Sequence, residues 1–324
     1  MATEKVLGMW WDTATDMFTF RISPKHDAEL LSGVRMPSKR EVLRTLMAIY
    51  DPMVLIANCL MYLKILLQEI WRSGCAWDDE ITGKLAEKWM IWIAVLPDVR
   101  KVSVPRCYRY ITTAEATNVV QLHVFCDASE NGIAAVAYFR FEEAGVIECA
   151  MVGSRTRVAP LKILSIPRLE LQAAVVGARL ADSIAGSHRM KISRRIFWTD
   201  SRDVVCWIRS DHRRYSQFVA FRISELLEST EGDEWRWVST RSNVADDGTK
   251  WQRLPDLQPT SRWFHGPDLL WKPETEWSGE GGDPGTTAEE IRPSVLHHMI
   301  TEPLVCFERF SKWKRLLRTV AYVH

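Results

Sequence analysis

The sequence predicts an α/β protein with a mixed five-stranded sheet, flanking helices and a mainly helical region in front of the sheet. Apolar runs over 122–126, 133–141 and 146–153 predict an antiparallel meander, with an Asn131-Gly132 turn between the first two strands. After the meander, helical periodicity alternates with short apolar runs, which is typical of parallel strands joined by helices. The expected later elements are helices over 167–185, 202–209 and 216–229 and strands over 195–199 and 235–239.

The region before the sheet is expected to contain a hairpin and three helices. Apolar residues flank a turn rich in Asp and Thr within 7–22, and this pattern predicts a hairpin. Ser38 and Glu41 have the spacing of a capping box, in which each side chain bonds the backbone N–H of the other residue, so we expect a helix from there to Ile49. Two further helices are predicted over 53–72 and 78–96.

Bulk composition limits the classes of protein to which the chain can belong. It has 324 residues, of which 47% are hydrophobic, and a net charge of +1, so it can bury a core and is no polycation. Seven scattered cysteines without a CxxC pair, and no secretory leader, predict reduced thiols in an intracellular protein. The longest apolar run, 53–67, is interrupted by Asn58 and Lys64, so no membrane span is expected.

Four acidic residues fall where the predicted elements end or begin. Because the ends of adjacent parallel strands lie about 4.8 Å apart, Asp127 after the first strand and Asp200 after the fourth are expected to be neighbours. Small residues at helical spacing let the long helix approach the sheet and carry Glu170, near its start, to the same edge. Asp246 follows the last predicted strand.

Crowded carboxylates favour a metal site. Four such groups repel one another and raise each other's pKa, and divalent cations remove this cost. Oxygen ligands without nearby His or Cys suit Mg²⁺ or Mn²⁺ rather than zinc, and two such ions support in-line attack of water on a phosphodiester. Taken singly, each acid also suits an ordinary turn or a solvated helix face, and the combination of all four is what favours catalysis.

Basic residues outnumber acids between Arg155 and Arg222, which favours contact with a nucleic-acid backbone over an ordinary solvated helix face. Further along the chain, 278–290 is expected to be a solvated linker and 304–323 a basic amphipathic helix.

Four short motifs follow one another along the chain: Phe125-Cys126-Asp127-Ala128-Ser129, Pro167-Arg168-Leu169-Glu170-Leu171, Trp198-Thr199-Asp200-Ser201 and Asn243-Val244-Ala245-Asp246. In this order they resemble the four motifs of the ribonuclease H region in BEL/Pao-type retrotransposon polyproteins. The flanks are similar too: 37–72 resembles the segment between polymerase palm and ribonuclease H of that group, 263–271 its stretch after ribonuclease H, and 307–323 its lead-in to the integrase. The resemblance therefore covers nearly the whole chain, and the four ordered motifs are its specific part.

The resemblance implies metal-dependent hydrolysis of the RNA strand of RNA/DNA hybrids, with two Mg²⁺ or Mn²⁺ ions. The implied catalytic residues and metal ligands are Asp127, Glu170, Asp200 and Asp246, with the adjacent Asp247 as an alternative fourth ligand. Candidates to contact the backbone of the hybrid are Ser129, Arg168 and Ser201, which equally suit roles as capping and surface residues.

The resemblance also implies a domain order. Residues 1–36 are expected to be the end of a reverse-transcriptase palm, 37–118 a helical thumb or connection, 119–255 the ribonuclease H-like domain, and 256–324 a linker and basic helix leading toward an integrase. Expected partners are the hybrid and the remaining reverse-transcriptase and integrase parts of the polyprotein, without a membrane. A cytoplasmic particle and the nucleus both fit as locations.

Two other functions compete with this interpretation. Without a Tyr-x-Asp-Asp polymerase motif or an integrase core, the chain also fits a catalytically inactive nucleic-acid-binding or connection remnant of such a polyprotein. The family has in addition been labelled a Pao retrotransposon peptidase. Aspartic peptidases need Asp-Thr-Gly or Asp-Ser-Gly, and neither occurs here, since Asp247-Gly248-Thr249 has the wrong order, so no peptidase activity is expected.

Overall fold

The computed structural model describes residues 3–6, 9–21, 28–109, 119–250, 255–277, 287–292, 312–315 and 317–318. Met1–Glu290 form one compact unit and Ile291–His324 a second. In the second unit the described residues include helical turns over 313–315 and 317–318, while the rest of the predicted basic helix lies outside the described residues. Residues 278–286 of the predicted linker also lie outside the described residues. The predicted domain boundaries stay predictions.

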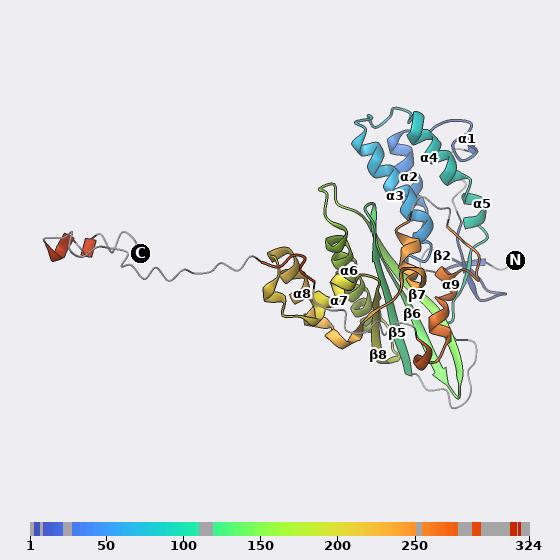
Figure 1. Ribbon diagram of the computed structural model, residues 1–324. Coiled ribbons are helices and arrows are strands. Elements are labelled where there is room, and N and C mark those ends of the chain that lie inside the picture. Colours follow the sequence, from blue (N-terminus) through green and yellow to red (C-terminus); the bar gives the residue numbers. More distant parts are fainter. Residues whose placement is uncertain are drawn as a thin grey trace. The chain divides into compact units, whose positions relative to one another are not determined.

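A five-stranded mixed sheet forms the centre of the first unit (Figure 1). The first three strands are antiparallel neighbours, and the last two run parallel to β5, in the order β7-β6-β5-β8-β9. This confirms the predicted sheet, although β9 ends two residues earlier than expected. The strands are β5 (Val119–Ala128), β6 (Gly132–Glu143), β7 (Val146–Val158), β8 (Lys191–Thr199) and β9 (Trp235–Trp237).

The long helix α6 (Ile166–Ser187) packs against β5 and β6 on one face of the sheet. Its approach is close because Gly177 has no side chain: a Cβ there would lie 2.3 Å from Sγ of Cys126. This close approach carries the start of α6 to the strand ends. The helices α7 (Arg202–Arg209) and α8 (Gln217–Ser229) pack beside α6.

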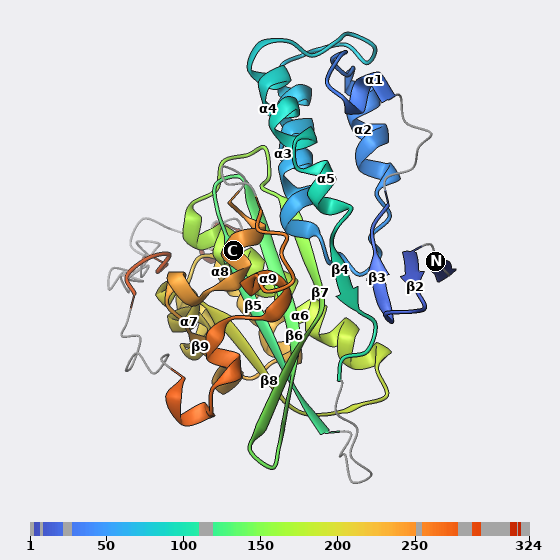
Figure 2. The same cartoon turned by 90° about the vertical axis from the view of Figure 1, so that its right-hand side faces the viewer.

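The opposite face of the sheet is covered by helices from before the sheet and by chain from after it (Figure 2). Phe125, Tyr138 and Trp198 of the sheet belong to the same buried cluster as residues of the N-terminal helices. Trp263 closes this core, since its indole Nε1 donates to the carbonyl of Leu55 at 2.7 Å. The helices are α1 (Ala28–Leu31), α2 (Lys39–Ala48), α3 (Ala57–Arg72), α4 (Gly83–Ile93), α5 (Leu96–Val99) and α9 (Arg262–His265).

The predicted capping box at Ser38 and Glu41 is confirmed, with both reciprocal bonds present. The next helix starts at Ala57 rather than at the predicted residue 53, because the carboxylate of Asp51 accepts the backbone N–H groups of Leu55 and Ile56 at 2.9 Å and holds a turn there. The predicted helix over 78–96 begins later and continues into the separate α5.

The predicted N-terminal hairpin is confirmed as β2 (Met9–Asp12) and β3 (Met17–Thr19). It belongs to a four-stranded sheet, because β1 (Thr3–Val6) pairs with β2, and β4 (Ser103–Pro105) pairs with β3. Among the described residues no helix is long and apolar enough to span a bilayer.

Candidate active site

Asp127 and Asp200 lie side by side at one edge of the sheet. Cys126 pairs with Thr199 across the parallel strands β5 and β8, so the residue that follows each of them comes to the same edge. Asp246 follows the last strand, as expected, and reaches this edge from a 3-10 turn, η4 (Val244–Gly248). η4 contacts both β5 and β6.

Asp127 is the most buried acid of the group, with 6% of its surface exposed. Burial, followed by the negative charge of Asp200, raises the pKa of Asp127 to about 8, and the charges of Asp246 and Glu170 add to the rise. A hydrogen bond from Oγ1 of Thr249 to its Oδ2, at 2.5 Å, offsets part of the rise. The four predicted acids therefore lie within electrostatic range of one another.

Glu170 stands on α6 and faces the same edge. Burial raises the pKa of Glu170 to about 7, a hydrogen bond from the Ser201 side chain lowers it in part, and the charges of Asp200, Asp203 and Glu289 raise it further. At neutral pH the cluster without bound metal therefore retains protons that isolated carboxyl groups would have lost.

Asn243, fully buried, connects the parts of the cluster. Its Nδ2 donates to the carbonyl of Cys126 and to Oδ1 of Asp200, both at 3.0 Å, and its Oδ1 accepts from the backbone N–H of Ala245 at 3.3 Å. The side chain thus joins β5, the end of β8 and η4. The four sequence motifs contain Asn243 without indicating a role for it, although its position before a turn is a signal for capping.

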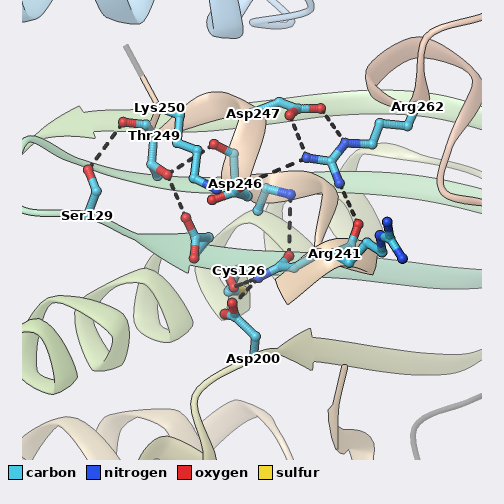
Figure 3. A network of polar contacts seen from close by, with 12 residues as sticks. Cys126, Ser129, Asp200, Arg241, Asp246, Asp247, Thr249, Lys250 and Arg262 are labelled. Atoms are coloured by element: carbon cyan, nitrogen blue, oxygen red, sulfur yellow. Dashed lines mark hydrogen bonds and ion pairs between the residues drawn. The ribbon is translucent and has the colours of Figure 1, made fainter. Parts of the chain in front are cut away.

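Asp246 and Asp247 point to different partners (Figure 3). One oxygen of Asp246 lies 2.5 Å from Nζ of Lys250, and the residue is 7% exposed. Asp247 instead accepts from the guanidinium of Arg262 through both oxygens, at 2.6 and 2.8 Å. The charge of Asp246 acts on Asp127, so the geometry favours Asp246 over its neighbour as the fourth member of the cluster.

The three residues predicted to contact nucleic acid all have partners inside the chain. Ser129 accepts two backbone N–H groups of the β5–β6 turn and donates to the carbonyl of Thr249 at 3.2 Å. Ser201 caps α7. Arg168 forms a two-pronged ion pair with Glu290, at 2.6 and 2.8 Å.

Some basic residues between Arg155 and Arg222 form ion pairs, and others are exposed to solvent. Arg194 and Arg195 form ion pairs with nearby glutamates. Between α6 and α8 a groove of about 280 Å³ is lined by Arg157, Arg179 and Arg222 together with Phe221. Solvent-exposed basic residues of the region include Arg155, Arg157, Lys162, Arg189, Lys191, Arg213 and Arg214.

The donor chemistry of the cluster fits a hard divalent cation. Among the described residues no lysine or arginine forms an ion pair with Asp127, Glu170 or Asp200, and the side-chain donors that reach Asp127 and Asp200 are the neutral groups of Thr249 and Asn243. Within the same described part of the chain, no three His, Cys, Asp or Glu side chains already stand in a metal-binding arrangement.

The sheet order, the crossover helix and the acids at the strand ends define a ribonuclease H-like domain. The family model described as "Pao retrotransposon-like RNaseH-like domain" matches residues 38–201, which is half of the chain, and the chain belongs to that family. The match begins at the cap of α2 and ends just after Asp200, so it includes the first three acids of the cluster, while Asp246 lies beyond it.

Several solved structures are similar to the chain at low identity. The N-terminal RNase H domain of rv2228c from Mycobacterium tuberculosis is 13% identical, and the match covers 40% of this chain and 93% of that one, with a TM-score of 0.27. RNase H1 from Halobacterium salinarum NRC-1 is 12% identical, with coverages of 39% and 90% and a TM-score of 0.26. LC9-RNase H1, a type 1 RNase H with the type 2 active-site motif, is 20% identical over 40% and 67%, with a TM-score of 0.27. No curated protein matches the chain.

Proposed function

We propose that the chain is a metal-dependent ribonuclease that hydrolyses the RNA strand of RNA/DNA hybrids. The observation that carries this proposal is the buried Asp127, which has no cationic partner among the described residues and lies near three further acids. Crowding of ionised carboxylates raises the free energy of the folded state, and a bound divalent cation would remove this repulsion. Membership of the Pao family supports the same conclusion.

Asp127, Glu170, Asp200 and Asp246 would hold two Mg²⁺ or Mn²⁺ ions, because their oxygens are the ligands that these cations prefer. Bound cations of this kind supply Lewis acidity for the attack of water on a phosphodiester. The remaining roles belong to the chain itself. Asn243 fixes the carboxylate of Asp200 through Nδ2, and the Thr249 hydroxyl orients Asp127. The protons that Asp127 and Glu170 hold at neutral pH leave as a cation binds.

The hybrid would lie along the exposed basic residues next to the cluster, attracted through its phosphates. Ser129 and Ser201 would act on the site through Thr249 and Glu170, and Arg168 would meet a phosphate only after exchanging its partner Glu290. We further propose that the family region works within a polyprotein. The segment 37–118 would connect it to a reverse transcriptase, and the C-terminal residues would lead to an integrase.

Cutting of a labelled hybrid tests the proposal. The full chain is incubated with an RNA/DNA hybrid and Mg²⁺ or Mn²⁺, beside Asp127→Asn and Asp200→Asn, with Asp233→Asn as a control because Asp233 is an exposed acid of a 3-10 turn. We expect hybrid-specific cutting of the RNA that EDTA and both cluster variants abolish and the control leaves unchanged. Hybrid binding without cutting would instead identify a non-catalytic remnant, for which the pairing of Asp246 with Lys250 is the supporting observation.

A further inference from the structure

Lys250 brings a positive charge into the carboxylate cluster. Its Nζ lies 2.5 Å from Oδ2 of Asp246, and Figure 3 shows its side chain beside Thr249 and Asp246. The second cation near that oxygen is Arg262, at 3.6 Å, and this guanidinium is committed to Asp247 at 2.6 Å. Lys250 is thus the closest cationic group to an acid of the cluster in the described part of the chain.

The backbone fixes this contact. The N–H of Lys250 and that of Thr249 both bond to the carbonyl of Asp246, at 3.1 and 3.2 Å, so the chain coils tightly after η4. The coil places Asp246, Thr249 and Lys250 on the same side. Thr249 then donates to Asp127, while Lys250 binds Asp246. One short segment therefore supplies the cluster with an acid, a hydroxyl donor and an ammonium group.

The pair differs from an ordinary surface ion pair. In the surface pair of Lys101 and Asp98 both side chains are largely exposed, at 74% and 55%. In the cluster pair the carboxylate of Asp246 is 10% exposed and the lysine 45% exposed, so a buried acid is held by a lysine that reaches in from solvent. An ammonium group on such a lysine can leave without unfolding the segment that carries it.

We propose that Lys250 is a positioning residue, an internal cation that occupies the oxygen of Asp246 which a divalent ion would otherwise take. This inference rests on the proposed function, because it assumes that the cluster binds metal. An ammonium and a divalent cation repel each other at one oxygen, so the metal at Asp246 must displace Lys250, while metal held by the other three acids need not. The chain then binds one divalent ion tightly and a second one weakly.

Metal binding without substrate tests the proposal. The stoichiometry and affinities of Mn²⁺ are measured on the full chain by titration calorimetry and by the electron paramagnetic resonance signal of free Mn²⁺. Lys250→Met removes the charge and keeps the length of the side chain, so we expect the weaker affinity to tighten roughly tenfold. Lys250→Arg retains the charge and should bind Mn²⁺ like the unmodified protein.

Lys162→Met is the matched control, because Lys162 is an exposed lysine in the loop before α6, and it should leave both affinities unchanged. Thermal unfolding in EDTA shows that each variant folds, and Lys250→Gln replaces the methionine variant if that one does not. An unchanged weaker affinity in both neutral variants, with two ions still bound, would overturn the role of Lys250 and leave the metal site intact. If the unmodified chain binds no Mn²⁺, the proposed function fails, and this inference fails with it.

Discussion

Glu41 at the head of α2 and Asp127 at the end of β5 are shielded carboxylates whose surroundings shift their pKa values in opposite directions. The guanidinium of Arg35 bonds both oxygens of Glu41, the capping box with Ser38 adds a backbone N–H, and the pKa of Glu41 falls to about 2. Burial and the neighbouring acids, Asp200 first among them, instead raise the pKa of Asp127 to about 8. The first arrangement stabilises the ionised carboxylate, and the second favours its protonated form.

The difference appears in how stability depends on pH. Asp127 has an ordinary pKa of 3.8, so between about pH 4 and pH 8 the folded protein holds a proton that the unfolded chain has released, and the free energy of unfolding falls as the pH rises. Glu41 has an ordinary pKa of 4.5, and its contribution is present above that pH and is lost as the pH falls toward 2.

The largest expected effect belongs to Asp127→Asn. We expect at least about a thousandfold loss of RNA cutting, because a metal ligand disappears. In EDTA at pH 8 the free energy of unfolding of this variant should be about 2 kcal/mol higher than that of the unmodified chain, since a neutral amide does not repel the other acids. Urea unfolding at pH 5 and pH 8 measures this, and the gain should shrink at pH 5. A variant less stable than the unmodified chain at pH 8 would break the comparison.

Asn243→Ala removes the connection between β5, β8 and η4. We expect the free energy of unfolding to fall by about 2–3 kcal/mol, because the buried carbonyl of Cys126 loses its donor and Asp200 loses its anchor. Urea denaturation measures the loss. Asn243→Asp is the informative partner variant, since it keeps the shape but adds a fifth acid, and it should be more damaging at pH 8 than at pH 5. Equal damage at both pH values would show that charge crowding is not the dominant cost there.

Glu41→Gln tests the opposite side of the comparison. We expect a loss of about 1–2 kcal/mol at pH 7, since the ion pair with Arg35 and part of the capping box disappear. Because the unmodified protein loses the same contribution in acid, the difference between the two proteins should vanish as the pH approaches 2. Chemical denaturation at pH 7 and pH 3 provides the measurement. A difference that persists undiminished in acid would contradict the low pKa of Glu41.

The smallest expected effect concerns Glu290, a carboxylate with an arginine partner beside the cluster. Glu290→Gln should tighten binding of an RNA/DNA hybrid by about two- to fivefold, because Arg168 is released for a phosphate. Fluorescence anisotropy at low salt, with Ca²⁺ in place of Mg²⁺, measures the affinity without cutting. Glu276→Gln, an exposed acid of the preceding 3-10 turn, is the control and should have no effect. Weaker binding by the Glu290 variant would show that the pair serves the fold alone.

Much of this arrangement was predictable from local sequence. Alternation and turn residues predict the five strands, and the strand ends predict the adjacency of Asp127 and Asp200, because the ends of neighbouring parallel strands meet at one edge of a sheet. The capping box at Ser38 was predictable because its two residues, Ser38 and Glu41, lie only three positions apart. Family resemblance on four motifs led to the same domain that the family model matches.

What could not be predicted depends on contacts between distant residues. The partner of Arg168 lies 122 residues further along the chain. The strands β1 and β4 each pair with one strand of the N-terminal hairpin, β1 with β2 and β4 with β3. Asp246 was expected after the last strand, and the 3-10 turn capped by Asn243, which carries it, was not predicted. The ion pair between Asp247 and Arg262 is likewise indicated by no spacing in the sequence.

Thermal unfolding with and without divalent cation tests the central claim, that the uncompensated acids form a cation site. At pH 8 a Mn²⁺ or Mg²⁺ concentration of about one hundred times the dissociation constant should stabilise the unmodified chain by about 2.7 kcal/mol and raise its Tm by about 5 °C. The rise should be smaller at pH 5, where protons compete for Asp127 and Glu170. Asp127→Asn should lose most of the rise. A Tm that does not respond to the cation, or an equal response in Asp127→Asn, would contradict the account.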